Sequence, residues 1–258
     1  MRRARRFAFR RLRPLLAGFR RELGGLIDCF LPVNCAFCNT PLASSAQPAI
    51  CSTCQRTLAE NRPASCPRCA LPYLDYGGSD HLCGDCQRQP PHYRTVCALG
   101  VYEGPLRQAI HRFKYQKDFT LATPLGHLLA AAVRQRGLLH ADLILPVPLH
   151  PSRLRQRTFN QSLLLARILG KRSSTPVAGN LLRRLRPTPS QQGLSLEDRR
   201  HNLHQAFALH APLNGESVLL VDDVMTSGAT IAACTKALLK NGAQTVDVAI
   251  LARAAKGL

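Results

Sequence analysis

The stretch of sequence that decides the fold reads Val218-Leu219-Leu220-Val221-Asp222-Asp223-Val224-Met225-Thr226-Ser227-Gly228-Ala229-Thr230. Four apolar residues, as expected of a buried strand, run directly into two aspartates. A short turn follows, and a helix is predicted to begin at its end. This order predicts a strand of a parallel sheet that carries the turn to the edge where ligands bind in open α/β folds.

The turn has the composition of a phosphate-binding loop. Gly228 allows the backbone to turn tightly beside a ligand, and successive N–H groups at a helix N-terminus attract an anion. Thr226, Ser227 and Thr230 add hydroxyl donors. The two carboxylates are unsuited to phosphate, but they suit ribose hydroxyls or a hydrated Mg²⁺ ion. The alternative is an ordinary strand–turn–helix that is capped by Thr226.

Strands and helices alternate from Thr95 onward. The expected strands cover residues 96–102, 141–147, 217–221 and 245–251, and the expected helices cover 105–115, 121–136, 160–169 and 229–240. Such alternation predicts a parallel sheet with helices on both faces. Residues 183–205 are polar, basic and loop-like. We therefore expect one α/β domain over residues 91–258.

Cysteine spacing predicts a metal-binding module over residues 25–90. Eight of the eleven cysteines form Cys-x-x-Cys pairs, which are Cys35/Cys38, Cys51/Cys54, Cys66/Cys69 and Cys83/Cys86. Each set of four thiolates is enough for one closed, structural zinc site. Cross-braced combinations of the pairs, disulfides and iron–sulfur ligation are the alternatives. Because the module has little apolar content, we expect the metal to supply folding energy.

Four further residues bear on this assignment. His81 lies two residues before Cys83 and can replace a cysteine as ligand, although we expect a loop histidine outside the site. Cys29, Cys97 and Cys234 lie in apolar stretches, and we expect them to be buried thiols.

The chain has 258 residues and a net charge of +20. This charge favours a polyanionic partner, namely nucleic acid, a phosphorylated small molecule or an anionic membrane surface, unless a basic tail alone inflates the sum. Residues 1–24 form a basic arm, which is either a solvated extension or an amphipathic helix at such a surface. We expect no transmembrane span and no secretory signal, and hence a cytoplasmic, reducing location.

Residues 218–230 closely resemble the signature of type I phosphoribosyltransferases. The resemblance implies that Asp222 and Asp223 contact the ribose hydroxyls of phosphoribosyl pyrophosphate, which binds with Mg²⁺. It also implies that the 5-phosphate lies against Thr226, Ser227, Gly228, Ala229 and Thr230.

A double zinc ribbon before such a domain resembles the ComF family of competence-associated proteins, including its GntX type linked to use of DNA as a nutrient. The resemblance extends from about residue 26 to residue 253. Supporting segments are 113–118, 145–150 and 153–162, followed by Thr188, Gln191, Arg199, Asn202 and Phe207. Thr158 departs from the pattern, because the family usually has glycine there.

The same segments hold candidate ligands for pyrophosphate. Lys114, Arg153 and Arg157 can neutralise the charge that develops as pyrophosphate leaves. A general basic rim that attracts any polyanion is the alternative. Asn160 and Gln161 also suit the cap of the helix that begins there.

The resemblance implies two functions that can coexist, both connected with DNA uptake or DNA utilisation. One is a phosphoribosyltransferase, for which no general base or nucleobase pocket is visible, so its activity and acceptor stay open. The other is a non-catalytic protein that handles single-stranded DNA with a ComFA-like helicase and uses the pocket as a ligand sensor. Aromatic residues make up only 5% of the chain, so such DNA binding would rest mainly on backbone electrostatics.

Overall fold

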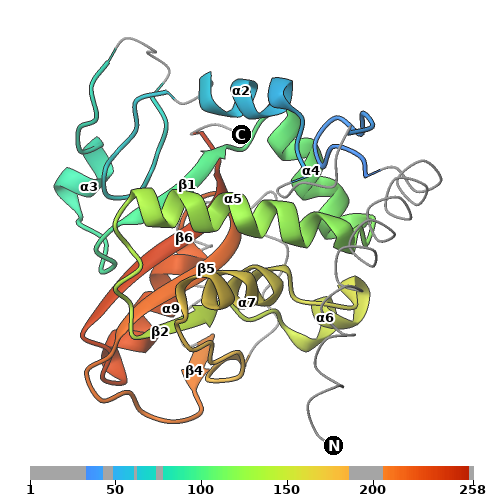
Figure 1. Cartoon of the computed structure of the whole chain (residues 1–258). Coiled ribbons are helices and arrows are strands. Elements are labelled where there is room, and N and C mark those ends of the chain that lie inside the picture. The colour runs from blue at the N-terminus through green and yellow to red at the C-terminus, as the bar shows by residue number, and fades with distance from the viewer. Residues whose placement is uncertain (1–32, 43–48, 61–62, 74–77, 186–205, 256–258) are drawn as a thin grey trace, which may run out of the picture.

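The centre of the fold is a four-stranded parallel sheet with the strand order β1-β6-β5-β2 (Figure 1). The structure is a computed structural model, and it describes residues 33–42, 49–60, 63–73, 78–185 and 206–255. The strands are β1 Val96–Val101, β2 Leu143–Pro146, β5 Ser217–Met225 and β6 Thr245–Arg253. The predicted parallel sheet flanked by helices is therefore confirmed.

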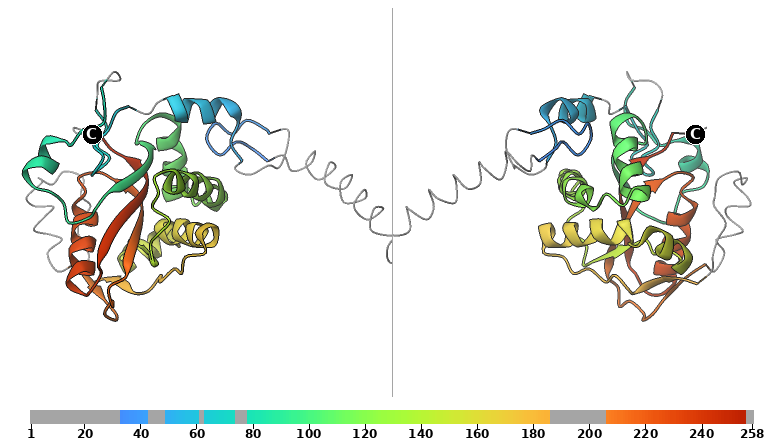
Figure 2. Two further views of the ribbon diagram at one scale, coloured as in Figure 1. Left: turned by 60° about the vertical axis from the view of Figure 1, so that its left-hand side comes forward. Right: turned by 90° about the vertical axis from the view of Figure 1, so that its right-hand side faces the viewer.

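Helices cover both faces of the sheet (Figure 2). One face carries α4 Gly104–Tyr115, α5 Ala122–Gln135 and α7 Gln161–Ser173, and the other carries α9 Ala229–Lys240. Successive residues of β5 enter different cores, because strand side chains alternate between faces. Leu219 packs in the α5/α7 core, whereas Leu220 packs in the α9 core. Burial on both faces explains the continuous apolar run before the aspartates.

Two strands continue further than the sequence predicts. β5 extends to Met225 and β6 to Arg253, whereas the expected ends were residues 221 and 251. Val224 and Met225 continue to pair with β6, and this pairing holds the polar end of β5 in the ladder. The two aspartates therefore lie within the strand rather than after it.

Several elements were not predicted, among them one helix and two strands of the α/β part. Helix α6 Pro151–Arg157 has no buried residue, so no apolar periodicity marks it in the sequence. Strands β3 Leu182–Arg184 and β4 Phe207–Leu209 pair antiparallel beside the sheet, and they fall at the edges of the segment expected to be a loop. The arm over 1–24, Cys29 and the family positions between 188 and 202 lie outside the described residues.

The two cysteine-rich segments pack on opposite faces of the sheet. The first includes helix α2 Ser52–Glu60, and its buried residues Cys35, Phe37 and Cys54 join the α4/α5 core. The second includes helix α3 Gly84–Arg88, and its buried residues join the α9 core. Figure 1 shows α2 beside α4, and α3 toward the opposite side of the molecule. Each segment is thus part of a core that the parallel sheet also forms.

Candidate functional site

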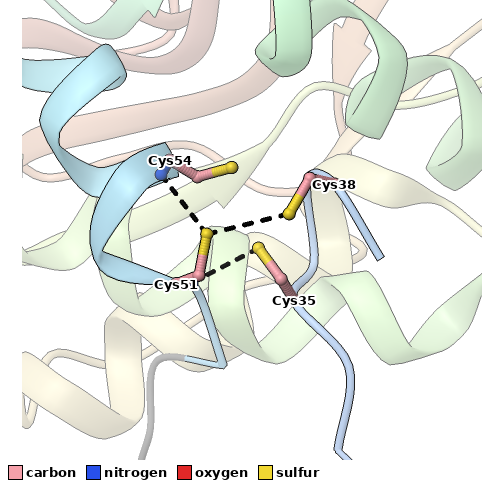
Figure 3. Close-up of side chains that lie close together, drawn as sticks. All are labelled: Cys35, Cys38, Cys51 and Cys54. Carbon is pink, nitrogen blue, oxygen red and sulfur yellow. Dashed lines mark hydrogen bonds between the residues drawn. The ribbon is translucent and has the colours of Figure 1, made fainter. Parts of the chain in front are cut away.

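The eight paired cysteines form two clusters of four. Cys35, Cys38, Cys51 and Cys54 form the first cluster (Figure 3), and Cys66, Cys69, Cys83 and Cys86 form the second. Within each cluster, all sulfur atoms lie within 4.8 Å of one another. Neighbouring pairs in the sequence therefore combine, which excludes the cross-braced alternative.

The sulfur spacing in both clusters fits tetrahedral zinc. The sulfur atoms of Cys38 and Cys51 are 3.7 Å apart, and those of Cys69 and Cys83 are also 3.7 Å apart. A zinc ion with Zn–S bonds of about 2.3 Å requires edges of about 3.8 Å between its ligands. Four thiolate ligands complete the tetrahedral coordination and leave no position open for water or substrate. The donor sets therefore fit structural zinc rather than a catalytic metal.

Backbone amides support the sulfur atoms as thiolates. The Cys51 amide donates to the Cys35 sulfur at 3.3 Å, and the Cys83 amide donates to the Cys66 sulfur at 3.4 Å. Hydrogen bonding to Thr40 lowers the pKa of Cys38 to about 6. Burial instead raises the pKa of Cys54, Cys69 and Cys86, so these thiols need the charge of a bound metal to be deprotonated.

The structure also tests the predictions for Cys97, Cys234 and His81. Cys97 and Cys234 are buried, as expected. His81 is exposed, and its Nδ1 lies 2.9 Å from the Ser79 carbonyl oxygen. Its ring stacks on Tyr73 at 4.2 Å between centroids. The four cysteines complete the second cluster without it, which agrees with its expected place outside the site.

The two aspartates of β5 have different partners. Asp223 lies on the α4 side, where Lys114 Nζ is 2.8 Å from its Oδ1 and Arg157 Nη1 is 4.0 Å from its Oδ2. Asp222 accepts a hydrogen bond of 2.9 Å from Ser162 Oγ at the start of α7. Burial, and then the charge of Asp223, raise the pKa of Asp222 to about 7. A carboxyl with a pKa near 7 is partly protonated at neutral pH, so a bound ligand can change its protonation state.

The turn after β5 has a glycine-dependent shape. Gly228 adopts a left-handed conformation with φ +80°, and a Cβ at this position would lie 2.6 Å from Met225 Cε. Gly228 is also the N-cap of α9, and the Ser227 hydroxyl accepts a hydrogen bond of 3.4 Å from the Ala229 amide at the start of this helix. Thr226 is therefore not the N-cap residue of α9. Thr226 is exposed and Ser227 is half-buried, so solvent reaches the turn.

The three basic candidates are not equivalent. Lys114 and Arg157 converge on Asp223, as the distances above show. Arg153 lies half-buried on α6. Burial, and then the nearby charge of Arg153, lower the pKa of Arg184 on β3. Arg184 was not among the predicted site residues, because β3 falls in the segment expected to be a loop.

Caps position the loop and helix that adjoin these cations. The Asn160 side chain accepts a hydrogen bond from the Leu163 amide at 3.3 Å, which confirms Asn160 as the cap of α7. Its amide group donates to the Val147 carbonyl at 3.1 Å and so ties this helix to the loop after β2. Thr158, where a glycine is usual, ends α6 with a left-handed φ of +68°.

Family models match both parts of the chain. The model described as a double zinc ribbon domain matches residues 26–98, and the model described as a phosphoribosyl transferase domain matches residues 171–258. Fold, clusters and models together define a protein with a double zinc ribbon followed by a phosphoribosyltransferase domain.

Relatives of known name cover nearly the whole chain. It is 37% identical over 228 residues to the DNA utilization protein YhgH of Escherichia coli O157:H7, with 86% of this chain and 98% of that protein covered. It is 35% identical over 237 residues to competence protein F of Haemophilus influenzae, with 87% and 99% covered. The chain belongs to the ComF/GntX family.

A solved structure is also similar. A purine phosphoribosyltransferase from Pyrococcus horikoshii matches with a TM-score of 0.31 and 20% identity, over 50% of this chain and 70% of that chain. In the part of the chain that the structure describes, no helix has the length and apolar character needed to cross a membrane.

Proposed function

We propose that this chain binds phosphoribosyl pyrophosphate, or a related ribose phosphate, together with Mg²⁺ at the carboxyl edge of its sheet. One observation carries the proposal: β5 presents two acids and then turns through a left-handed Gly228 into the 12-residue helix α9. The amides at the start of such a helix favour an anion. The turn is open to solvent, as a ligand requires.

The proposed roles follow from chemistry and position. The 5-phosphate lies against the amides and hydroxyls of residues 226–230, and the ribose hydroxyls donate to Asp222 and Asp223. Lys114 and Arg157 stand beside Asp223, where they can share their charge with a pyrophosphate group. If a nucleophile is also bound, these cations stabilise the charge on departing pyrophosphate, and ribosyl phosphate is transferred to that acceptor.

The biological role we propose is DNA uptake or DNA utilisation in the cytoplasm. It rests on the names of the relatives from Escherichia coli and Haemophilus influenzae, which cover nearly all of this chain. A role in handling single-stranded DNA, with a ComFA-like helicase as partner, is the second candidate. The rim beside Asp223 favours it, because Tyr115 and Phe119 are more than half exposed and Arg157 lies over the Tyr115 ring.

Titration calorimetry with phosphoribosyl pyrophosphate tests the first candidate. We expect binding that requires Mg²⁺ in the wild-type protein and loss of binding in Gly228→Ala, whose Cβ would displace Met225. Gly215→Ala is the matched control, because Gly215 also has a left-handed φ (+95°) but open space around it. Absence of binding to the wild-type protein would contradict the proposal.

A gel shift with single-stranded DNA tests the second candidate. Exposed aromatic rings stack bases, and each stacking contact contributes about 1–3 kcal/mol. We expect binding that weakens steeply with salt and is reduced in Tyr115→Ala. A response to salt that is flat, or a Tyr115→Ala variant that binds normally, would remove this candidate.

A further inference from the structure

A single buried arginine joins the second cysteine cluster to the phosphate-binding turn. Arg253 is the last residue of β6, where it pairs with Met225 of β5, and it is 7% exposed. Its Nε donates to the Cys69 carbonyl at 3.1 Å. Its Nη1 donates to the carbonyls of Met225 (3.0 Å), Ala254 (3.0 Å) and Thr226.

The guanidinium group suits this position because of its shape. Its donors form a planar fork, so one side chain can satisfy carbonyls on two separate segments, whereas the ammonium of lysine is a compact point charge. Buried carbonyls need donors, and loss of one leaves a costly unsatisfied group. The Met225 carbonyl also accepts a hydrogen bond of 3.0 Å from the Ala254 amide, so Arg253 matters most for the carbonyls of Thr226 in the turn and of Cys69 in the cluster.

The cysteine cluster also supplies a counter-charge. No carboxylate forms an ion pair with Arg253 among the residues that the structure describes. Zinc held by four thiolates carries a net charge of about −2. The bond from Arg253 Nε to the Cys69 carbonyl, at 3.1 Å, makes the guanidinium a close neighbour of this cluster. Metal loading of the second cluster thus favours a buried Arg253.

Further hydrogen bonds fix the segment of residues 66–69 to other parts of the chain. The Pro67 carbonyl accepts hydrogen bonds from Thr95 Oγ1 at 2.8 Å and from Arg136 Nη2 at 3.1 Å. The first cluster differs, because its buried residues join the α4/α5 core on the other face of the sheet. The chain therefore contains two chemically matched cysteine clusters, only one of which has a described bond through Arg253 to the turn.

We propose that Arg253 is a positioning residue that makes the second cysteine cluster part of the ribose phosphate site. The inference rests on the proposed function, because it takes the turn at residues 226–230 as the phosphate-binding element. Loss of metal from the second cluster releases the segment of residues 66–69 and removes the negative charge that offsets Arg253. The turn then loosens. Loss of metal from the first cluster leaves the turn intact.

Matched ligand variants test this coupling. Cys86→Ser removes a ligand of the second cluster, and Cys38→Ser removes one of the first. We expect each variant to lose one zinc, as measured by metal analysis. We expect Cys86→Ser to weaken binding of phosphoribosyl pyrophosphate by about tenfold to a hundredfold, the range for losing a charge-assisted hydrogen-bond network. Cys38→Ser should bind like the wild-type protein.

Arg253 variants separate positioning from folding. We expect Arg253→Met to keep both zinc ions but to bind phosphoribosyl pyrophosphate at least about tenfold more weakly, and Arg253→Lys to recover only part of the affinity. Hydrogen exchange gives a readout that needs no ligand: amides of residues 226–230 should exchange faster in Cys86→Ser and Arg253→Lys than in Cys38→Ser.

The outcomes distinguish the two proposals. A wild-type protein that fails to bind phosphoribosyl pyrophosphate contradicts the proposed function, whereas the exchange comparison still tests the coupling. Normal affinity and normal exchange of residues 226–230 in Arg253→Lys and Cys86→Ser overturn the coupling alone. If Cys86→Ser does not fold, the Arg253→Lys comparison decides.

Discussion

Lys114 Nζ lies 2.8 Å from Asp223 Oδ1, and the exposed fractions of the two side chains are only 12% and 10%. This ion pair joins the end of α4 to the end of β5. The sequence makes Lys114 a candidate ligand for pyrophosphate, and the family resemblance implies that Asp223 contacts ribose, so the two were expected to serve different parts of a ligand. Lys114 and Asp223 instead form an ion pair at the sheet edge, in which each charge offsets the other.

The ion pair leads to a stability prediction. Replacing Lys114 by Met leaves Asp223 as a buried charge with only the more distant Arg157, and we expect the free energy of unfolding to fall by about 3 kcal/mol. Adding Asp223→Asn to that variant should restore most of the loss. Urea denaturation of the two single variants and the double variant measures the coupling. Additive losses would show that the pair contributes nothing to stability.

A second prediction concerns pH. Asp222 has a pKa raised to about 7 in the folded state, so the folded protein binds this proton more tightly than the unfolded chain, whose carboxyl has the ordinary value of 3.8. The resulting stability is fully present below about pH 4 and is lost as pH rises through about 7. We expect Asp222→Asn to flatten this decline and to raise the melting temperature above pH 7.

A control for that variant lies at the other end of β5. Asp142 accepts a hydrogen bond of 2.9 Å from the Ser217 amide, far from the turn. We expect Asp142→Asn to keep the decline between pH 5 and pH 8, measured as melting temperature against pH. An Asp222→Asn variant with the same pH profile as the wild-type protein would show that the Asp222 carboxyl does not cause the decline in melting temperature.

Thr158 is the subject of a third prediction. Thr158 and Ser174 both end helices in the left-handed region, with φ of +68° and +58°. That region is least favourable for a β-branched residue. Since glycine removes the strain but adds unfolded-state entropy, we expect Thr158→Gly to stabilise the protein by about 0.5–1 kcal/mol. Ser174→Gly should gain less stability, because serine is not β-branched. Urea denaturation measures the free energy of unfolding of both variants, and a larger gain in Ser174→Gly would contradict this account.

Zinc release from the two clusters should differ in rate. Cys38 is exposed and Cys51 is half-buried, whereas all four cysteines of the second cluster are buried. We therefore expect a chelator with a colorimetric zinc indicator to reveal a fast phase and a slow phase of similar amplitude. Cys38→Ser should abolish the fast phase alone. A single phase in the wild-type protein, or loss of the slow phase in Cys38→Ser, would count against this assignment.

The elements that the sequence predicts correctly are those with local signals. Apolar runs mark β5 and β6, and the Cys-x-x-Cys spacing predicts the two sets of four sulfur atoms that the fold brings together. Helix α6 lacks a signal because it buries no residue, although Pro151 and the capping His150 precede its basic turn. Local patterns thus predict the sheet and the clusters but not the exposed helix.

Long-range contacts account for what the sequence reading missed at the site. Ser162 bonds to Asp222 across 60 positions, and Arg253 bonds to Cys69 across 184 positions. No spacing rule connects residues so far apart, because their meeting depends on the path of the whole chain. The sequence therefore predicts the turn and the acids but not the side chains that hold them in place.

A crystal structure with bound ribose 5-phosphate tests the central claim most directly. We predict the phosphate within hydrogen-bond distance of the backbone amides in the turn around Gly228, with a ribose hydroxyl on Asp222 or Asp223. Ribose 5-phosphate bound elsewhere on the molecule, with this turn empty, would contradict the claim.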